Sequence, residues 1–235
     1  DLKKHLWRLD EAKKRDHRKL GKELGLFAFH DVSPGAPFWL PHGMIVVREL
    51  ERFAREVQDA RGYQEIATPI LVNKKLWEQS GHWEHYSENM FKLEVEEQLL
   101  SLKPMNCPES TYVYRHALRS YRDLPLRLSE MGRLHRYERS GTLTGLFRVR
   151  QFTQDDAHIY CRPDQVQEEI TGVLELVKEF YKTFDLAPTF RLSTRPEKFL
   201  GSVEQWDEAE RSLHEALRAN GLAYEVKPGD GAFYG

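Results

Sequence analysis

The chain has 235 residues, of which 40% are hydrophobic, 31% charged and 11% aromatic. This composition excludes general disorder and provides enough apolar mass for one large or two small cores. The 35 Lys and Arg residues offset 37 Asp and Glu residues to a formal charge of -2. The chain as a whole therefore exerts no net attraction on nucleic acid or on anionic membrane, and any polyanion must meet a local patch.

No segment approaches the ~20 uncharged apolar residues of a membrane span. Residues 1–24 also lack the apolar core of a signal peptide, so the sequence predicts a cytoplasmic protein. Two cysteines, Cys107 and Cys161, are too few for a disulfide framework and leave thiol, metal and core roles open. Residues 229–235 have turn chemistry without a closing element, so we expect a partial domain.

The leading segment, residues 1–24, carries nine Lys or Arg against five Asp or Glu, with leucines on one side of a 3.6-residue period. This pattern predicts an N-terminal connector helix over 1–24, ahead of a main domain over 25–235. Contact with phosphates is one use for its positive charge. A charge-rich helix is more often only a solvated face, and we favour that interpretation.

The next segments alternate between helix and strand signals. Residues 46–57 are amphipathic and predict a helix that ends at Gly62. The run 63–71 is strand-like, and its Pro69 has no amide hydrogen, which favours an edge or an interface. A short helix near Leu76 leads into an aromatic loop over residues 81–86.

The pattern then becomes β-type, with one helix at 108–119 between runs at 91–95, 99–103, 126–131, 133–138 and 148–160. No βαβ alternation passes through these runs, which favours an antiparallel sheet. After them come a long helix, a strand, a second helix and a final strand, at 166–184, 189–192, 203–220 and 223–226. The predicted fold class is α+β, an antiparallel sheet flanked by helices.

The most informative stretch is 148–158, because alternation along a strand places every second side chain on one face. That face carries Arg148, Arg150, Phe152, Gln154, Asp156 and His158. At ~3.3 Å per residue the row is about 33 Å long, enough to offer cations to phosphates, an aromatic ring to a base and a polar end to a small substrate. An exposed face with scattered salt bridges is the alternative, and it predicts mixed Lys, Glu and Thr instead.

The preceding run supports the same face, since Arg136 and Glu138 share its parity and a glycine loop, 139–147, joins the two runs. A guanidinium donates two parallel hydrogen bonds to phosphate. A carboxylate can accept from an exocyclic amine, which distinguishes adenine from guanine. Taken alone, Arg136 and Glu138 are also consistent with a cross-strand ion pair.

Cys107 lies between an extended segment and a proline at a predicted helix start, where the positive end of the dipole favours a lowered thiol pKa. Together with His158 it could bind zinc. Two ligands do not make a site, and a lone cysteine is usually a small core residue. Other candidate ligands without compelling spacing are His82, His85, His116 and His135.

In combination, these motifs resemble the class II aminoacyl-tRNA synthetases. The run 63–71 with Pro69 is similar to their first motif, which builds the dimer interface, and the two arginine-bearing runs with the glycine loop resemble the second. Five further stretches are specific for the threonyl-tRNA synthetase family: 80–83, 103–108, 152–158, 192–196 and 231–235. The prolyl and seryl families share the general motifs without the Cys107 and His158 pairing.

The resemblance implies the class II catalytic fold over 25–235, incomplete at its C-terminal end. It also implies ATP-dependent activation of threonine and its transfer to tRNA(Thr), with Zn²⁺ and Mg²⁺ as cofactors and a homodimer formed through Tyr63–Leu71. In the family, the third zinc ligand and the third class II motif follow the stretch that corresponds to residues 232–235, so they are expected to lie outside this sequence. The fragment alone is then expected to have poor activity.

The resemblance also implies residue roles. Arg136 would bridge the ATP α-phosphate and the threonine carboxylate, Glu138 would hold the adenine amine, and Phe152 would stack on adenine. Arg148 would contact the nucleotide phosphates, and Cys107 and His158 would bind zinc. The implied threonine-binding residues, with Asp156 as acceptor of the substrate hydroxyl, are Met105, Gln154, Asp156 and Tyr234.

Three alternatives stay open at this point. The chain could belong to another class II synthetase, prolyl or seryl, or to a synthetase-like paralogue that binds tRNA or regulates without activating amino acids. A zinc-free α+β domain is the plainest alternative.

Overall fold

The computed structural model describes residues 2–234. They form two compact units, the first comprising the residues up to His116 with Leu128–His158, and the second comprising Ala117–Arg127 with the residues from Ile159 onward. Each unit is described by itself. Among the described helices, none is both long and apolar enough to cross a membrane.

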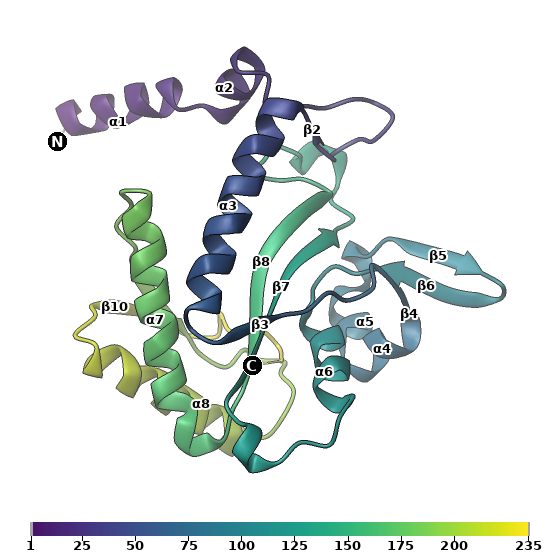
Figure 1. Ribbon diagram of the computed structural model, residues 1–235, viewed down its shortest axis with the longest axis vertical. Helices are drawn as coiled ribbons and strands as arrows, with labels where there is room; N and C mark the ends of the chain where they lie inside the picture. The colour runs from purple at the N-terminus through teal and green to yellow at the C-terminus, as the bar shows by residue number, and fades with distance from the viewer. Residues whose placement is uncertain (1, 235) are drawn as a thin grey trace. The chain divides into compact units, whose positions relative to one another are not determined.

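The leading segment of the first unit consists of two helices, α1 (Leu2–Lys14) and α2 (His17–Glu23), instead of one continuous helix (Figure 1). The break falls at Asp16, whose side chain accepts a hydrogen bond from the Arg18 amide and caps α2. An N-cap side chain competes with helix continuation in this way. No residue of α1 is buried, whereas α2 buries Gly21 against the Phe27 ring.

Helix α3 (Pro41–Asp59) begins with a proline in its first turn and ends ahead of Gly62, which has a φ of 74°. Ala54 and Val57 on one face are buried. The amide of Gln58 donates to Asp155 on β8 at 2.5 Å, and Figure 1 shows α3 running alongside that strand. The amphipathic pattern therefore predicted the helix, but only part of its apolar face is buried, because Val46 and Leu50 are 46% and 45% exposed.

The main sheet of the first unit has the strand order β3-β7-β8, from β3 (Tyr63–Glu65), β7 (Leu126–His135) and β8 (Gln151–Tyr160). Just beyond the end of β7, the Arg136 amide donates to the Arg150 carbonyl at the start of β8, so these two strands run in opposite directions. The two predicted runs 126–131 and 133–138 are thus one strand that ends at His135. Strand β8 starts three residues later than predicted, because the Arg150 amide bonds the Gly35 carbonyl.

A second sheet has the order β4-β6-β5, with all neighbours antiparallel, from β4 (Leu71–Asn73), β5 (Lys92–Val95) and β6 (Gln98–Leu102). The prediction of one strand over 63–71 is wrong, because the chain leaves β3 after Glu65 and joins this different sheet at Leu71. Pro69 lies in the irregular link between the two, where its missing amide hydrogen breaks no ladder.

Short elements complete the first unit: β1 (Phe27–Ala28), β2 (Phe38–Trp39), α4 (Lys74–Gln79), α5 (His82–Tyr86), η1 (Ser87–Asn89), α6 (Cys107–Arg115) and η3 (Ser140–Thr142). The aromatic stretch predicted as a loop is therefore partly helical. His82 opens α5 and is buried beside Trp77, with its Nδ1 2.9 Å from the Ser80 hydroxyl. The predicted helix over 108–119 begins one residue earlier and ends at Arg115.

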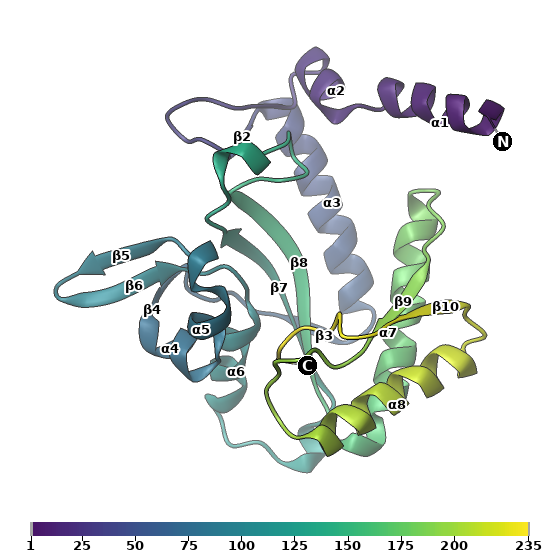
Figure 2. The ribbon, with the colours of Figure 1, turned by 180° about the vertical axis from the view of Figure 1, so that it is seen from behind.

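The second unit contains η2 (Tyr121–Asp123), η4 (Pro163–Gln165), α7 (Val166–Thr183), β9 (Phe190–Ser193), α8 (Val203–Ala219) and β10 (Tyr224–Lys227). Strands β9 and β10 are parallel neighbours (Figure 2), with Leu192 opposite Val226. Helix α8 makes the crossover that parallel strands require. Leu174, Leu192 and Leu217 form the core between these elements.

Candidate metal centre and nucleotide site

Three side chains of the first unit converge at the start of α6. Cys107 opens the helix, and Asp156 and His158 project from the same face of β8, two residues apart. One ligand atom from each lies within 4.8 Å of the others. Among residues 2–234, this is the one group of three His, Cys, Asp or Glu side chains found so close together. The parity of β8 and the helix start at Cys107, favoured by Pro108 in the first turn, together explain the convergence.

The donor set of this cluster suits zinc, which prefers thiolate sulfur and imidazole nitrogen. Burial, together with the nearby Asp156 charge, raises the pKa of the Cys107 thiol to about 11. The expectation of a lowered pKa at the helix start is therefore wrong, because loss of water outweighs the dipole of a short helix. A metal that binds here must displace the thiol proton, so binding would release a proton.

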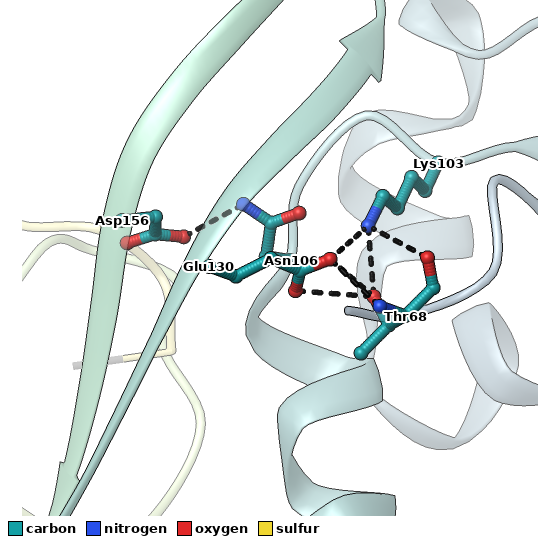
Figure 3. A network of polar contacts seen from close by, with 5 residues as sticks. All are labelled: Thr68, Lys103, Asn106, Glu130 and Asp156. Carbon is teal, nitrogen blue, oxygen red and sulfur yellow. Dashed lines mark hydrogen bonds and ion pairs between the residues drawn. The ribbon is translucent and has the colours of Figure 1, made fainter. Parts of the chain in front are cut away.

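Asp156 is held on both oxygens. One accepts a hydrogen bond from the Asn106 side-chain amide at 3.0 Å, and the other accepts from the Ala157 backbone amide at 2.9 Å. Figure 3 shows the Asn106 amide pointing at the carboxylate from the loop between β6 and α6. Asp156 is half-buried, so a ligand can reach it, while its orientation is fixed by these two donors.

A buried ion pair stabilises the same loop (Figure 3). The Lys103 ammonium, which is 1% exposed, lies 2.8 Å from the Glu130 carboxylate of β7 and donates to the Thr68 hydroxyl at 2.8 Å. Thr68 in turn donates from its backbone amide to Glu130 at 2.8 Å. Every charged group in the network has an opposite or hydrogen-bonding partner, as burial requires.

Arg136 lies between the candidate metal ligands and the residues predicted to bind a nucleotide. Its Nε donates to the Pro104 carbonyl at 3.2 Å, in the loop that leads to Cys107. Its guanidinium carbon lies 5.0 Å from the centre of the Phe152 ring and 6.0 Å from that of Tyr86. Arg136 and Phe152, predicted separately from two runs, are therefore adjacent, in a geometry typical of a cation–π contact.

Glu138 and Arg148, the other two predicted nucleotide residues, form an ion pair with a 3.3 Å separation. The Glu138 side chain is 15% exposed, whereas that of Arg148 is 56% exposed. Arg150 fixes the backbone here by donating from Nε to the Glu138 carbonyl at 2.9 Å. The arrangement presents one acceptor and one exposed cation at the base of the glycine loop.

The remaining predicted residues lie as follows. Gln154 is exposed on β8 between Phe152 and Asp156, and Met105 is half-buried in the loop between Pro104 and Asn106. Tyr234 belongs to the second unit, where it lines a cavity of about 650 Å³, so its role at the site stays a prediction. The four other histidines considered as ligands, His82, His85, His116 and His135, lie outside the group formed by Cys107, Asp156 and His158.

Sequence reasoning missed residues that support the site through contacts distant in sequence. Asn106, Lys103 and Glu130 are three of them; all three are buried polar side chains, and no local sequence signal assigned them a role. His17 of α2 is another, because its Nε2 accepts a hydrogen bond from the Leu146 amide in the glycine loop at 2.8 Å. The leading segment therefore does more than present a solvated face.

Residues 91–225 match the family model of the tRNA synthetase class II core domain (G, H, P, S and T). The chain belongs to this family. The match includes Cys107, Arg136, Asp156 and His158, and the antiparallel pairing around β7 and β8 is in accord with the class II fold.

Similarity to individual proteins indicates which synthetases of this family the chain resembles. The chain is 53% identical over 235 residues to threonine–tRNA ligase 2 of Bacillus subtilis, which covers all of this chain and 37% of the relative. A crystal structure of the RNA binding domain of threonyl-tRNA synthetase from Cryptosporidium parvum Iowa II has a TM-score of 0.89 and 48% identity, covering 94% of this chain and 56% of that one.

A prolyl-tRNA synthetase from Giardia lamblia, solved with prolyl-adenylate, has a TM-score of 0.65 at 18% identity. That similarity covers 73% of this chain and 36% of the other, and it shows the shared fold alone. The chain spans little more than a third of the length of the Bacillus subtilis relative.

Proposed function

We propose that this chain is part of the catalytic core of a longer threonine–tRNA ligase, which activates threonine with ATP and transfers it to tRNA(Thr). The observation that carries the proposal is the convergence of Cys107, Asp156 and His158 within 4.8 Å. The high identity to threonine–tRNA ligase 2 of Bacillus subtilis over the whole chain supports it. Translation in the cytoplasm is the setting that this activity implies.

Cys107 and His158 would hold a zinc ion, with a third protein ligand from beyond this sequence. The ion would supply a Lewis-acidic position for the amino and hydroxyl groups of threonine. Asp156 would accept the hydrogen bond of the substrate hydroxyl, which its two tethered oxygens are oriented to do. Valine has no hydroxyl, so a site that demands this group can exceed the ~10²-fold discrimination of an apolar pocket.

Serine keeps both the amino and the hydroxyl group, so this site should reject serine poorly. Met105, Gln154 and Tyr234 would line the amino-acid pocket. Met105 shares the loop of Cys107, and Gln154 shares the β8 face of Asp156, which supports two of the three assignments.

At the nucleotide end, Arg136 would bind the ATP α-phosphate together with the threonine carboxylate, and Phe152 would stack on adenine beside it. Glu138 would accept from the adenine amine, and Arg148 would contact phosphates after exchanging its present partner. The carboxylate attacks the α-phosphorus in line, so these residues contribute positioning and cationic stabilisation, with Mg²⁺ on the leaving pyrophosphate.

The segment Tyr63–Leu71 would form a homodimer interface. In its irregular link, Ile70 is 39% exposed, and Leu71 at the start of β4 is 44% exposed. Exposed apolar side chains on neighbouring residues favour contact with a second copy of the chain.

ATP–pyrophosphate exchange by the full-length protein tests this proposal, with threonine, serine, valine and proline as substrates. We expect preference for threonine, tolerance of serine and rejection of valine. Preference for proline would indicate a prolyl-type enzyme. Absence of exchange with every amino acid would favour a paralogue that binds tRNA without activation.

A further inference from the structure

We infer that Asn106 is a positioning residue for amino-acid selectivity, holding the Asp156 carboxylate toward the substrate hydroxyl, and that Gly132 keeps open the space this amide needs. The inference rests on the proposed activation of threonine. It assigns a role to two residues that touch neither substrate nor metal in the proposal.

The contact between Asn106 and Asp156 has a defined direction. Asn106 is fully buried, and its Nδ2 lies 3.0 Å from a carboxylate oxygen of Asp156. A carboxylate only accepts hydrogen bonds, so the nitrogen of the amide must face it. A hydrogen bond to a charged group in a water-poor site is among the stronger polar interactions of a protein.

Gly132 on β7 lies directly against this amide. A Cβ added at Gly132 would be 2.2 Å from the Asn106 Oδ1 and 2.4 Å from its Nδ2. Contacts that short cannot occur, so any larger residue at position 132 must push the amide away from Asp156. Gly132 does not adopt the left-handed backbone conformation that favours glycine. The need for glycine at this position therefore comes from the space that the Asn106 amide occupies.

The backbone before Asn106 is pinned from both sides, which prevents the amide from following a displaced carboxylate. The Lys103 amide donates to the Ile70 carbonyl at 2.8 Å, and its carbonyl accepts from the His135 amide at 3.0 Å. The buried ion pair of Lys103 with Glu130 anchors the side chain of the same residue (Figure 3). Three residues further on, the Asn106 carbonyl accepts from the Ser110 amide and starts α6.

This rigidity has a consequence for the metal cluster. The ligand atoms of Cys107 and His158 are close enough to Asp156 for a freely rotating carboxylate to join them as a third ligand. The Asn106 amide opposes that rotation, so Asp156 remains available to a substrate hydroxyl. Loss of the amide should therefore reduce discrimination against valine without removing the metal.

Three variants of the full-length protein test the inference. Asn106→Asp keeps the shape and removes the donor, Asn106→Ala removes the donor without adding charge or bulk, and Gly132→Ala displaces the amide. Gly172→Ala is the matched control, because a Cβ at Gly172 has no atom within 4 Å. The readouts are kcat/KM for threonine and valine in pyrophosphate exchange, zinc content, and thermal unfolding.

We expect the first three variants to lose about ten- to a hundredfold in kcat/KM for threonine, with a similar fall in the threonine-to-valine ratio and wild-type zinc content. The control should match the wild type. An unchanged ratio in the folded variants would overturn the inference, and so would loss of zinc in step with selectivity, which indicates a merely structural role. Failure of the wild type to prefer threonine would instead contradict the proposed function.

Discussion

The side chains at the two ends of the predicted 148–158 row differ in how they are held: the proposed metal end lies on β8, and the proposed nucleotide end lies just ahead of that strand. At the metal end, Asp156 is fixed by the fully buried Asn106, in a loop anchored by Lys103 at 1% exposure. At the nucleotide end, Arg148 is 56% exposed and pairs with Glu138 at 3.3 Å in contact with water.

The contrast suits two different chemical tasks of the proposed function. In the proposed function, rejection of valine depends on placing one acceptor accurately, which the buried Asn106 amide favours because its displacement would cost the hydrogen bond to Asp156. Binding and releasing a nucleotide requires cations that can change partners. An exposed ion pair is weak enough to break for each incoming phosphate.

The largest effect should come from breaking the buried ion pair at the metal end. Replacing Lys103 by Met leaves Glu130 buried without its cation, and we expect stability to fall by about 3–5 kcal/mol. The measurement is the urea midpoint of the full-length protein. The double variant Lys103→Met with Glu130→Leu removes both charges and should recover most of the loss. A double variant as unstable as the single one would contradict the explanation that the loss of stability comes from an unpaired buried charge.

Arg136, which connects the two ends, should give the next largest effect. Arg136→Ala is expected to lower threonine activation by about 10²- to 10³-fold, since it removes a donor to the charge that develops at the α-phosphate. Zinc content should not change. Arg136→Lys restores the charge without the planar fork and should recover only part of the rate. Equal activity of the Ala variant and the wild type in pyrophosphate exchange would remove Arg136 from the catalytic role.

At the glycine loop, two glycines provide an internal comparison. Gly145 has a φ of 49°, and an added Cβ would lie 2.2 Å from the His17 ring, whereas Gly141 has no atom within 4 Å of such a Cβ. Gly145→Ala should therefore cost about 1–2 kcal/mol locally and raise the KM for ATP about tenfold. Gly141→Ala should leave KM nearly unchanged. Indistinguishable KM values would mean that the contact with α2 does not shape the nucleotide site.

The smallest effect is expected for Arg148→Ala, because exposed pairs contribute about 0.2–1 kcal/mol and salt screens them. The KM for ATP should rise about two- to fivefold at low salt, and the difference should shrink as salt is added. Arg191→Ala is a matched control, since Arg191 and Glu225 form another exposed pair at 3.3 Å in the second unit. A loss of several hundredfold would show that Arg148 belongs with the rigid residues.

Periodicity in the sequence was sufficient to predict the main helices and most strands, because those patterns are local. It failed where a distant contact decides the structure. The run 63–71 divides between two sheets, and β8 starts late because Arg150 bonds the Gly35 carbonyl.

For the site, strand parity placed Asp156 and His158 on one face, and the family resemblance added Cys107; the three residues converge in the structure. The thiol pKa was predicted in the wrong direction, because burial is set by the tertiary fold. Asn106 and Gly132 were missed for the same reason, since they meet only when β7 packs against the loop before α6.

In the proposed function, a zinc ion held by Cys107 and His158 selects the amino acid, and the two cysteines of the chain allow a direct test. Cys107 lies in the cluster, whereas Cys161 is also a half-buried free thiol but lies outside it. The measurement is the threonine-to-valine ratio in ATP–pyrophosphate exchange, with zinc content, for Cys107→Ser and Cys161→Ser in the full-length protein. We predict that Cys107→Ser loses both zinc and selectivity while Cys161→Ser retains both. Full selectivity in the Cys107→Ser protein would contradict the account.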